Sequence, residues 1–205
     1  MPDTTAPSWA RCVENLWLPA QWGGHPALDF CNTMAGWGGP TQHEYLTDFH
    51  HLWVFALDAN LLGVAAAGPE PSRAAGAELR RARALRAAAY AVLTAAGNQD
   101  SWATISRAVE QAASAARFVP TSPMARWVLP AELGVRLPVL ALARSLGELL
   151  GSQDVAYISR CPGDGCGWIF LDRTRRRRWC SMAVCGNRAK ARRHADKAAA
   201  HQQGD

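Results

Sequence analysis

Four of the six cysteines lie close together near the C-terminus, in a pattern typical of a metal site. Cys161 and Cys166 form one C-x4-C pair, and Cys180 and Cys185 form a second pair after thirteen intervening residues. Zinc binds four thiolates tetrahedrally at about 2.3 Å, and two close pairs separated by a loop supply that arrangement. Because all four ligands are cysteines, no coordination position is left for water. The pattern therefore predicts one structural Zn2+ ion rather than a catalytic one.

Three other uses of paired cysteines compete with zinc. Two disulfides would need an oxidising compartment, but the first 25 residues show no secretory signal, so we expect the chain to stay in the cytoplasm. A thioredoxin-like redox pair needs C-x-x-C after a strand, which is not the spacing here. An iron–sulfur cluster also accepts four thiolates, and the spacing leaves that alternative open.

The segment around the cysteines is strongly basic. Residues 160–197 contain 11 arginines and lysines and 3 aspartates, a charge of +8, whereas the rest of the chain sums to −3. Four thiolates with one zinc ion carry a charge of about −2, so the segment keeps about +6. A basic segment of this size is typical of a surface that binds a polyanion such as nucleic acid.

The cations expected to contact nucleic acid form two groups. One group follows a predicted strand at 168–171, and the other follows the last cysteine. Residues 175–179 are expected to form a returning strand or turn. The chain after Asn187 is expected to form a basic helix, with Asn187 as a candidate N-cap. The expected contact residues are Arg173, Arg175, Arg176, Arg177, Arg178, Asn187, Arg188, Lys190, Arg192 and Arg193. A competing role for the first five is to neutralise the thiolates through N–H···S contacts.

Duplex DNA is the expected partner of this basic helix. With the helix in the major groove, Asn187, Arg188 and Arg192 near its start would reach base edges. RNA is the alternative, because Trp179 could stack on an unpaired base. The competing role for Trp179 is a place in the core of the hairpin beneath the zinc ion.

The residues before the cysteines predict helices that must position this module. Apolar residues recur at helical spacing over about 73–96, 102–117 and 138–150, with glycine or proline at the boundaries. A short helix is expected within 24–33, with Pro26 in its first turn.

Three shorter segments complete the expected domain. Residues 1–24 are expected to be mostly irregular, and Thr41–Glu44 matches a capping box for a helix that runs to Gly63. A hairpin is expected around Thr121–Pro123. The predicted fold is therefore mainly α: a helical domain over residues 1–151, then a small treble-clef-like zinc ribbon with a C-terminal basic helix over 155–201.

Aromatic and polar residues of the helical domain suggest a pocket for a small-molecule effector. Nine tryptophans in 205 residues suit both cores and ligand pockets. The candidate pocket residues are Trp22, Asp29, Asn32, Trp37 and Trp53. The competing role is core packing for the tryptophans, and a cap or structural hydrogen bond for Asp29 and Asn32.

Several classes of protein are not expected. The sequence has no nucleophile elbow, phosphate loop or dinucleotide fingerprint, so we expect no enzyme. Its apolar stretches are broken by arginine, glutamate or glycine before they reach 18 residues, so no membrane span is expected.

Two parts of the sequence resemble known families. The run Cys180–Arg188 (CSMAVCGNR), preceded by Trp168–Asp172, resembles the CGNR zinc finger, and the segments Gly24–Thr33 and Leu79–Arg86 resemble the ABATE domain. Together the two resemblances cover nearly the whole chain. They imply a stress-related bacterial transcription regulator in which Cys161, Cys166, Cys180 and Cys185 hold the zinc.

The sequence thus predicts a zinc-containing, DNA-binding transcription regulator. Its helical domain would sense an effector or assemble the protein into homo-oligomers. The first alternative is a protein–protein adaptor whose zinc module docks an acidic surface of the transcription machinery. The second is an RNA-binding protein.

Overall fold

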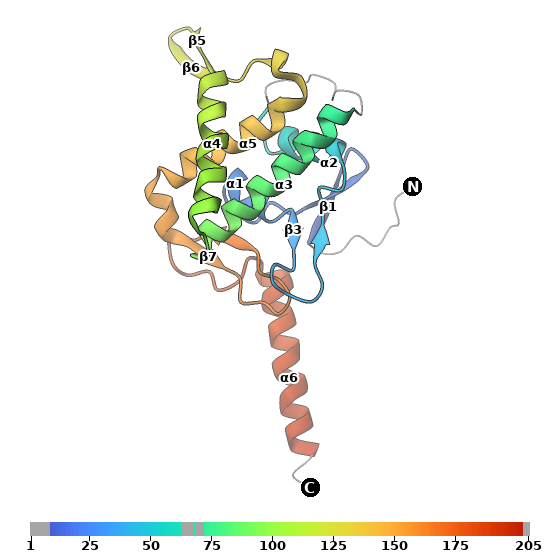
Figure 1. Cartoon of the computed structure of the whole chain (residues 1–205). Helices are drawn as coiled ribbons and strands as arrows, with labels where there is room; N and C mark the ends of the chain where they lie inside the picture. The colour runs from blue at the N-terminus through green and yellow to red at the C-terminus, as the bar shows by residue number, and fades with distance from the viewer. Residues whose placement is uncertain (1–8, 63–67, 69–71, 203–205) are drawn as a thin grey trace.

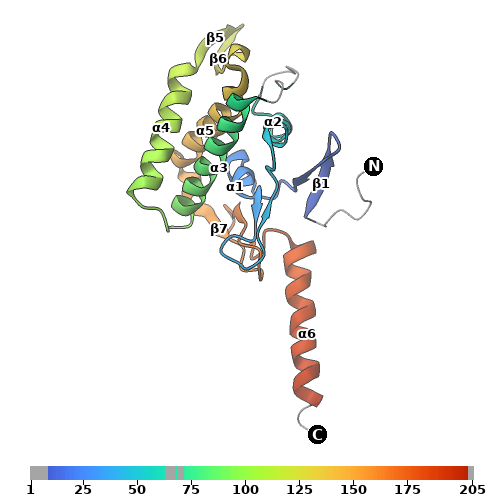
Figure 2. The ribbon, with the colours of Figure 1, turned by 45° about the vertical axis from the view of Figure 1, so that its right-hand side comes forward.

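The computed structural model describes residues 9–62, 68 and 72–202, and side chains up to residue 197. The described chain is mainly helical, with six α-helices and four two-stranded antiparallel sheets. Figures 1 and 2 show a helical body from which the last helix, α6, projects alone. No helix in the described ranges is both long and apolar enough to cross a membrane.

The N-terminal segment forms a hairpin, so the expectation of an irregular arm is wrong for its described residues. Strands β1 (Ala10–Val13) and β2 (Leu16–Pro19) pair antiparallel. Glu14 and Asn15 form the turn with φ of 48° and 63°, as a tight hairpin requires. Neither residue is glycine, which is why the usual turn signal is missing from the sequence.

The short helix α1 (Pro26–Cys31) lies within the expected segment, with Pro26 in its first turn. The capping box at Thr41–Glu44 is wrong: β3 (Met34–Ala35) pairs there with β4 (His43–Glu44). Helix α2 (Phe49–Asp58) begins five residues after Glu44, and the Asp48 carboxylate caps it by accepting from the His51 N–H at 2.9 Å. The Glu44 carboxylate instead pairs with Arg86 of the next helix.

Three long helices build the core, close to the predicted positions. They are α3 (Arg73–Leu93), α4 (Gln99–Ala115) and α5 (Leu137–Leu150). Helix α5 is the central one, because it contacts α1, α2, α3 and α4 and buries ten of its fourteen residues. Figure 2 shows α3 and α4 as neighbouring helices, with α5 packed against them.

The predicted hairpin is present as β5 (Arg117–Thr121) and β6 (Met124–Val128). It lies at the end of the molecule opposite α6 (Figure 1). Phe118 and Trp127 pair across its strands, with 62% and 56% of their surface exposed. Two short 3-10 helices, Ala131–Arg136 and Gln153–Tyr157, flank α5.

The cysteine-rich segment begins with another antiparallel pair, β7 (Ile158–Arg160) and β8 (Ile169–Leu171), which confirms the predicted strand. Residues 175–179 form no strand: a hydrogen-bonded turn lies just before them at Arg173–Thr174, and the chain then continues irregularly to Trp179. Residues 172–178 are called the arginine turn. A π-helical turn, Met182–Gly186, leads directly into α6 (Asn187–Gln202). Asn187 is therefore not an N-cap: its backbone is helical, and its amide donates to the Ala183 carbonyl at 3.0 Å.

Strand β8 connects two apolar clusters. Ile169 and Leu171 belong to the main helical core, whereas Phe170 belongs to a second cluster with Trp168, Tyr45 and three of the cysteines. Successive side chains of a strand point to opposite faces, so one strand supplies both clusters. The cysteine-rich segment is therefore packed into the body rather than attached to it by a linker.

Candidate metal centre and nucleic-acid interface

The four clustered cysteines converge on one point. Their Sγ atoms all lie within 4.8 Å of one another. The Sγ of Cys180 is 3.6 Å from that of Cys166 and 3.6 Å from that of Cys185. Tetrahedral coordination with zinc–sulfur bonds of about 2.3 Å places sulfurs about 3.8 Å apart. The geometry fits one structural zinc ion, and no described cysteine is in a disulfide.

The local backbone presents the sulfurs from two turns. The first pair lies in the loop between β7 and β8, where the Cys161 N–H donates to the Trp168 carbonyl at 2.7 Å. Cys180 follows the arginine turn, and Cys185 lies in the π-helical turn. A larger residue would be crowded at Gly163, because a Cβ there would lie 3.1 Å from the Cys185 sulfur.

Arginines surround the sulfurs and hold the surrounding loops. The Arg188 guanidinium donates to the Cys185 sulfur at 3.4 Å, which offsets thiolate charge. Arg177 donates to the backbone carbonyls of Cys180 and Trp22 at 2.7 and 3.0 Å, and lies 4.5 Å above the Phe170 ring. Arg177 is thus bound to the backbone of its own chain, although the residue remains exposed.

Two family models match this chain. Residues 24–153 match the ABATE family, described as "Putative stress-induced transcription regulator", and residues 158–198 match the CGNR zinc finger. The chain belongs to the ABATE family. No curated protein matches it. The four cysteines lie within the residues matched by the CGNR zinc finger. Residues 24–153 form the ABATE region, and residues 158–198 form the CGNR finger.

A buried aspartate organises the arginine turn of the CGNR finger, and the sequence analysis missed it. Asp172 accepts from the Arg177 N–H at 2.7 Å and from the Thr174 hydroxyl at 2.9 Å. Burial alone would raise the pKa of Asp172, but these hydrogen bonds outweigh it and lower the pKa. Aspartate that bonds backbone amides a few residues later is a known turn signal, so the run Asp172–Arg177 contained this information.

The remaining predicted contact residues divide into paired and available cations. Arg173 binds Asp154 with N–O distances of 2.7 and 2.5 Å, and Arg192 binds Asp164 at 2.6 Å. Two arginines lie over aromatic rings, Arg175 over Tyr157 and Arg178 over Trp179. Within the described chain, Arg176, Lys190 and Arg193 form no ion pair.

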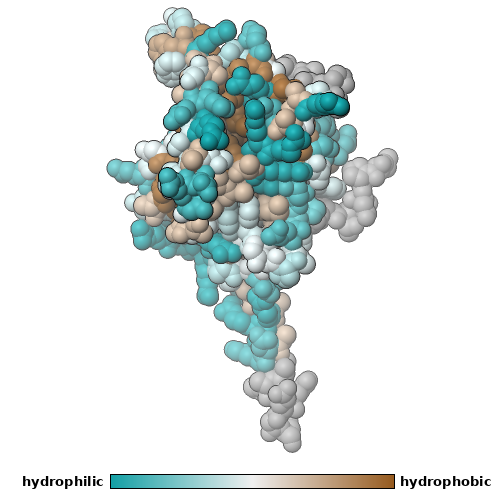
Figure 3. Space-filling model, viewed as in Figure 1, coloured by the Kyte–Doolittle hydropathy of each residue, from teal (hydrophilic) through white to brown (hydrophobic). Residues whose placement is uncertain are grey.

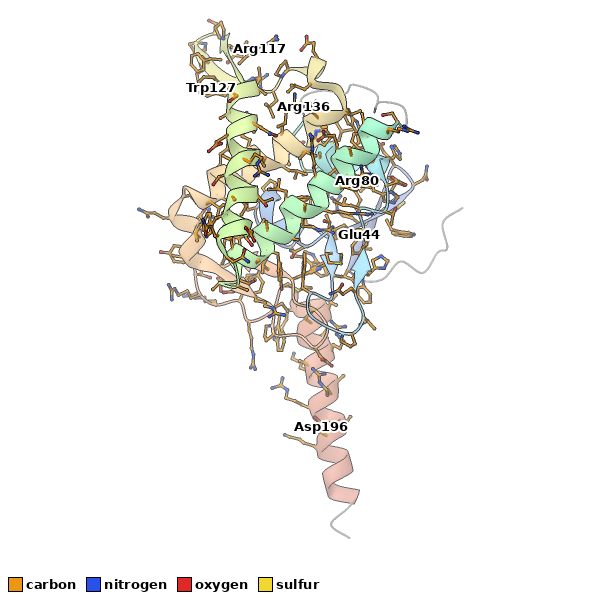
Figure 4. The ribbon with its side chains drawn as sticks, in the orientation of Figure 1. Glu44, Arg80, Arg117, Trp127, Arg136 and Asp196 are labelled. Carbon is orange, nitrogen blue, oxygen red and sulfur yellow. The ribbon has the colours of Figure 1, made fainter. Side chains whose placement is uncertain are left out.

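Helix α6 presents its cations to solvent. Figure 3 shows mostly hydrophilic side chains along the described part of α6. Figure 4, in which Asp196 marks its outer half, shows side chains of α6 extending sideways from the helix. Asn187 lies at the base of the helix, where its amide group is bonded to the Ala183 carbonyl, so it is less available to a base edge.

The five predicted pocket residues do not line one cavity. Trp53 is 3% exposed in the main core, and Trp37 stacks on Tyr90 at 4.1 Å while its N–H donates to the Cys31 carbonyl. Asn32 bonds the Ile169 backbone through both its amide oxygen and its amide nitrogen at 2.9 Å. Asn32 therefore acts as an extra strand partner for β8.

Asp29 and Trp22 lie at the contact between the two regions. Asp29 is 6% exposed, and its carboxylate accepts from the Gly23 N–H at 2.8 Å. Burial raises the pKa of Asp29 to about 7, against the opposing effect of that hydrogen bond. Trp22 packs edge-on against Trp168 with ring centroids 5.8 Å apart, beside a cavity that the sequence analysis did not predict.

Proposed function

We propose that this protein is a zinc-containing, DNA-binding transcription regulator in which α6 and the arginine turn contact the DNA backbone. The observation that carries the proposal is the position of α6: it projects from the body with cations on several sides. A helix that is polar all round gains little from packing against its own domain, and short isolated helices are marginal in water. A phosphate surface would stabilise such a helix.

The basic residues of this region have two different roles, one in stabilising the fold and one in binding phosphate. Arg177 and Arg188 stabilise the CGNR finger, whose order of hairpin, arginine turn and helix we assign to a treble-clef-like type. Arg176, Lys190 and Arg193 supply the phosphate contacts. Arg192 joins them, because its pair with Asp164 is half-exposed and such pairs contribute little to stability. The zinc ion fixes the stabilising arginines and the phosphate-binding side chains in one arrangement.

The protein would act by binding rather than by catalysis. Four cysteines fill the coordination positions of one zinc ion, so the metal has no open position for a substrate. Phosphate contacts fix position without reading sequence, whereas base edges are read in the grooves. The other exposed side chains of α6 next to these phosphate contacts are the candidates for base contacts.

The salt dependence of DNA binding tests this proposal. Four phosphate contacts, from Arg176, Lys190, Arg192 and Arg193, would make log K fall against log salt with a slope of about −4. The double variant Lys190→Gln/Arg193→Gln should flatten that slope by about 2, because each phosphate contact contributes about one unit. Fluorescence anisotropy of a labelled duplex at four salt concentrations gives the slope.

Arg117→Gln/Arg126→Gln, on the β5–β6 hairpin at the opposite end, is the matched control and should leave the slope unchanged. The proposal predicts that the protein prefers some genomic duplexes over random duplex, RNA and heparin. Equal affinity for all of these polyanions would contradict it. Tighter binding to RNA, or a partner protein that stays bound after nuclease treatment, would favour the RNA-binding or adaptor alternative instead.

A further inference from the structure

A cavity of about 420 Å³ lies where strand β6, helix α5 and the chain that follows α2 meet. Its described lining residues fall within 60–62, 126–129 and 137–148, all in the ABATE region. The cavity is therefore separate from the zinc site. Its volume falls in the range of pockets that bind small molecules, and only the folded chain brings the three segments together.

An arginine joins strand β6 to α5 beside this cavity. The Arg144 guanidinium of α5 donates to the Trp127 carbonyl of β6 at 2.8 Å and to the Glu148 carboxylate at 2.9 Å. Trp127, which is labelled in Figure 4, nevertheless remains exposed. An isolated two-stranded hairpin is only marginally stable in water. A molecule bound between β6 and α5 would therefore bury apolar surface and hold the hairpin against the helix.

The α5 side of the cavity is a stripe along the helix. Leu137, Ala141 and Ser145 recur every four residues, and Glu148 follows them after a further three. Residues at this spacing lie on one face of a helix, and at 1.5 Å per residue the stripe is about 16 Å long. The first three residues are buried and form its floor. An elongated floor suits an extended chain better than a compact ring.

The apolar part of the lining is mostly aliphatic. Leu61 and Leu62 line the cavity from the chain after α2, and Val128 and Leu129 line it from the end of β6. Trp127 is the one aromatic residue among the described lining residues. Burial against such side chains is non-directional and grows with apolar area, so the lining favours a hydrocarbon chain.

The charges of the lining residues favour an anionic head group. Arg144 and Glu148 form an ion pair, whereas Arg126 forms none within the described chain. The described lining therefore carries a net charge of +1. A guanidinium binds a carboxylate through two parallel N–H···O bonds. Ser145, which is 4% exposed, adds a hydroxyl that can donate or accept a hydrogen bond.

We propose that this cavity binds a medium-chain aliphatic carboxylate, with the alkyl chain along the α5 stripe and the carboxylate on Arg126. The elongated aliphatic lining selects the chain, and the single unpaired cation selects one negative charge. The site gives the ABATE region a small-molecule ligand. Binding there does not require the DNA contacts assigned to α6, because the two sites share no residue.

A series of straight-chain acids tests the fit of the alkyl chain. Hexanoate, octanoate and decanoate are titrated into the zinc-loaded full chain by calorimetry, at concentrations below those at which they form micelles. We expect one site per chain. Affinity should rise about tenfold with each two added methylenes, because each methylene buries further apolar surface.

Probes with one chain length and different charges test the head group. Octanoate should bind about tenfold more tightly than octanol, and octylammonium should bind most weakly. Arg126→Gln should weaken octanoate binding about tenfold and leave octanol within twofold, because only the charged hydrogen bonds are lost. Arg117→Gln, on the same hairpin but outside the described lining, is the matched control and should bind octanoate like the original chain.

Two wall variants keep the test decisive. Ala141→Leu adds bulk in the middle of the floor and should abolish binding of octanoate and octanol alike. If this variant melts at a lower temperature than the original chain, Val128→Asp replaces it. Val128 is half-buried on β6, so a carboxylate at this position would repel the acid and should abolish octanoate binding.

Three results would overturn the proposal: no saturable binding of any acid, equal affinity for octanoate, octanol and octylammonium, or octanoate binding that survives Arg126→Gln or the wall variant unchanged. Anisotropy of a labelled duplex, measured on the same protein, keeps the proposed function separate. Octanoate binding by a chain that does not bind DNA would contradict the proposed function alone. DNA binding without octanoate binding would contradict this site alone.

Discussion

The ABATE region and the CGNR finger of this protein are stabilised by different means. The ABATE region buries leucines of α5 such as Leu142 and Leu146 against four other helices. The finger buries mainly Trp168, Phe170 and its cysteines in a separate small cluster. The first region can rely on apolar burial, which scales with area, whereas the second needs a metal ion to fix its loops.

The two regions nevertheless depend on each other, because hydrogen bonds and apolar contacts join them. Besides the Asn32 bonds to β8, the Tyr90 hydroxyl donates to the Gly167 carbonyl at 2.6 Å, and the Leu171 N–H donates to the Gly23 carbonyl at 2.8 Å. Ile169 and Leu171 are part of the main core. The finger therefore needs both zinc and the helical body for its fold.

Removal of zinc should produce the largest effect and separate the two regions most clearly. A strong chelator, or Cys180→Ser, should unfold α6 and the loops of the finger, because structural zinc contributes about 10 kcal/mol or more. The ABATE helices should remain but melt at a lower temperature, since β8 leaves their core. Circular dichroism, proteolysis and metal analysis measure these changes.

Cys12→Ser is the matched control for zinc removal, because Cys12 is exposed on β1 outside the cluster. Its zinc content and melting should match those of the original chain. An unchanged melting temperature of the ABATE helices after chelation would show that the two regions are energetically independent, contrary to the shared core.

Breaking the Asn32 contact should have an intermediate effect. Asn32→Leu keeps the approximate volume but leaves the buried Ile169 N–H and carbonyl without partners, which should lower the free energy of unfolding by about 3 kcal/mol. Urea denaturation measures the loss, and zinc release to a chromogenic chelator should become faster.

Asn32→Asp sharpens this test. It keeps an acceptor for the Ile169 N–H but, when ionised, sets a carboxylate against the Ile169 carbonyl. Its stability should therefore recover in mild acid, where a protonated aspartate can donate. Stability equal to that of the original chain in both variants would mean that β8 does not depend on Asn32.

Titration of Asp29 should have the smallest effect. Because burial raises its pKa to about 7, the folded protein keeps a proton that the unfolded chain releases near pH 4. Stability should therefore fall as the pH rises from about 4 to 7 and level off above that. Asp29→Asn should remove about 1–2 kcal/mol of this decline between pH 5 and 7. Urea unfolding at several pH values measures it, and identical pH profiles would contradict the burial argument.

Features with local signals could be predicted from the sequence. The zinc cysteines follow from their spacing, helices α3 to α5 from apolar periodicity between breakers, and the β5–β6 hairpin from its turn residues. The capping box failed because Glu44 lies in strand β4, where its carboxylate accepts from Arg86, 42 residues away, and from the Leu46 N–H rather than from a helix N-terminus. A capping motif competes with every charged residue that the fold brings near it.

Local patterns along the chain are enough to identify the residues that can bind zinc, the long helices and the basic C-terminus. Each of these depends on residues within a few turns of one another. Three other features became apparent only in the folded molecule: which arginines are engaged, the bonding of Asn32 to a strand 137 residues later, and the cavity that Trp9 and Trp168 share. Those contacts arise when distant segments pack, and no spacing along the chain encodes them.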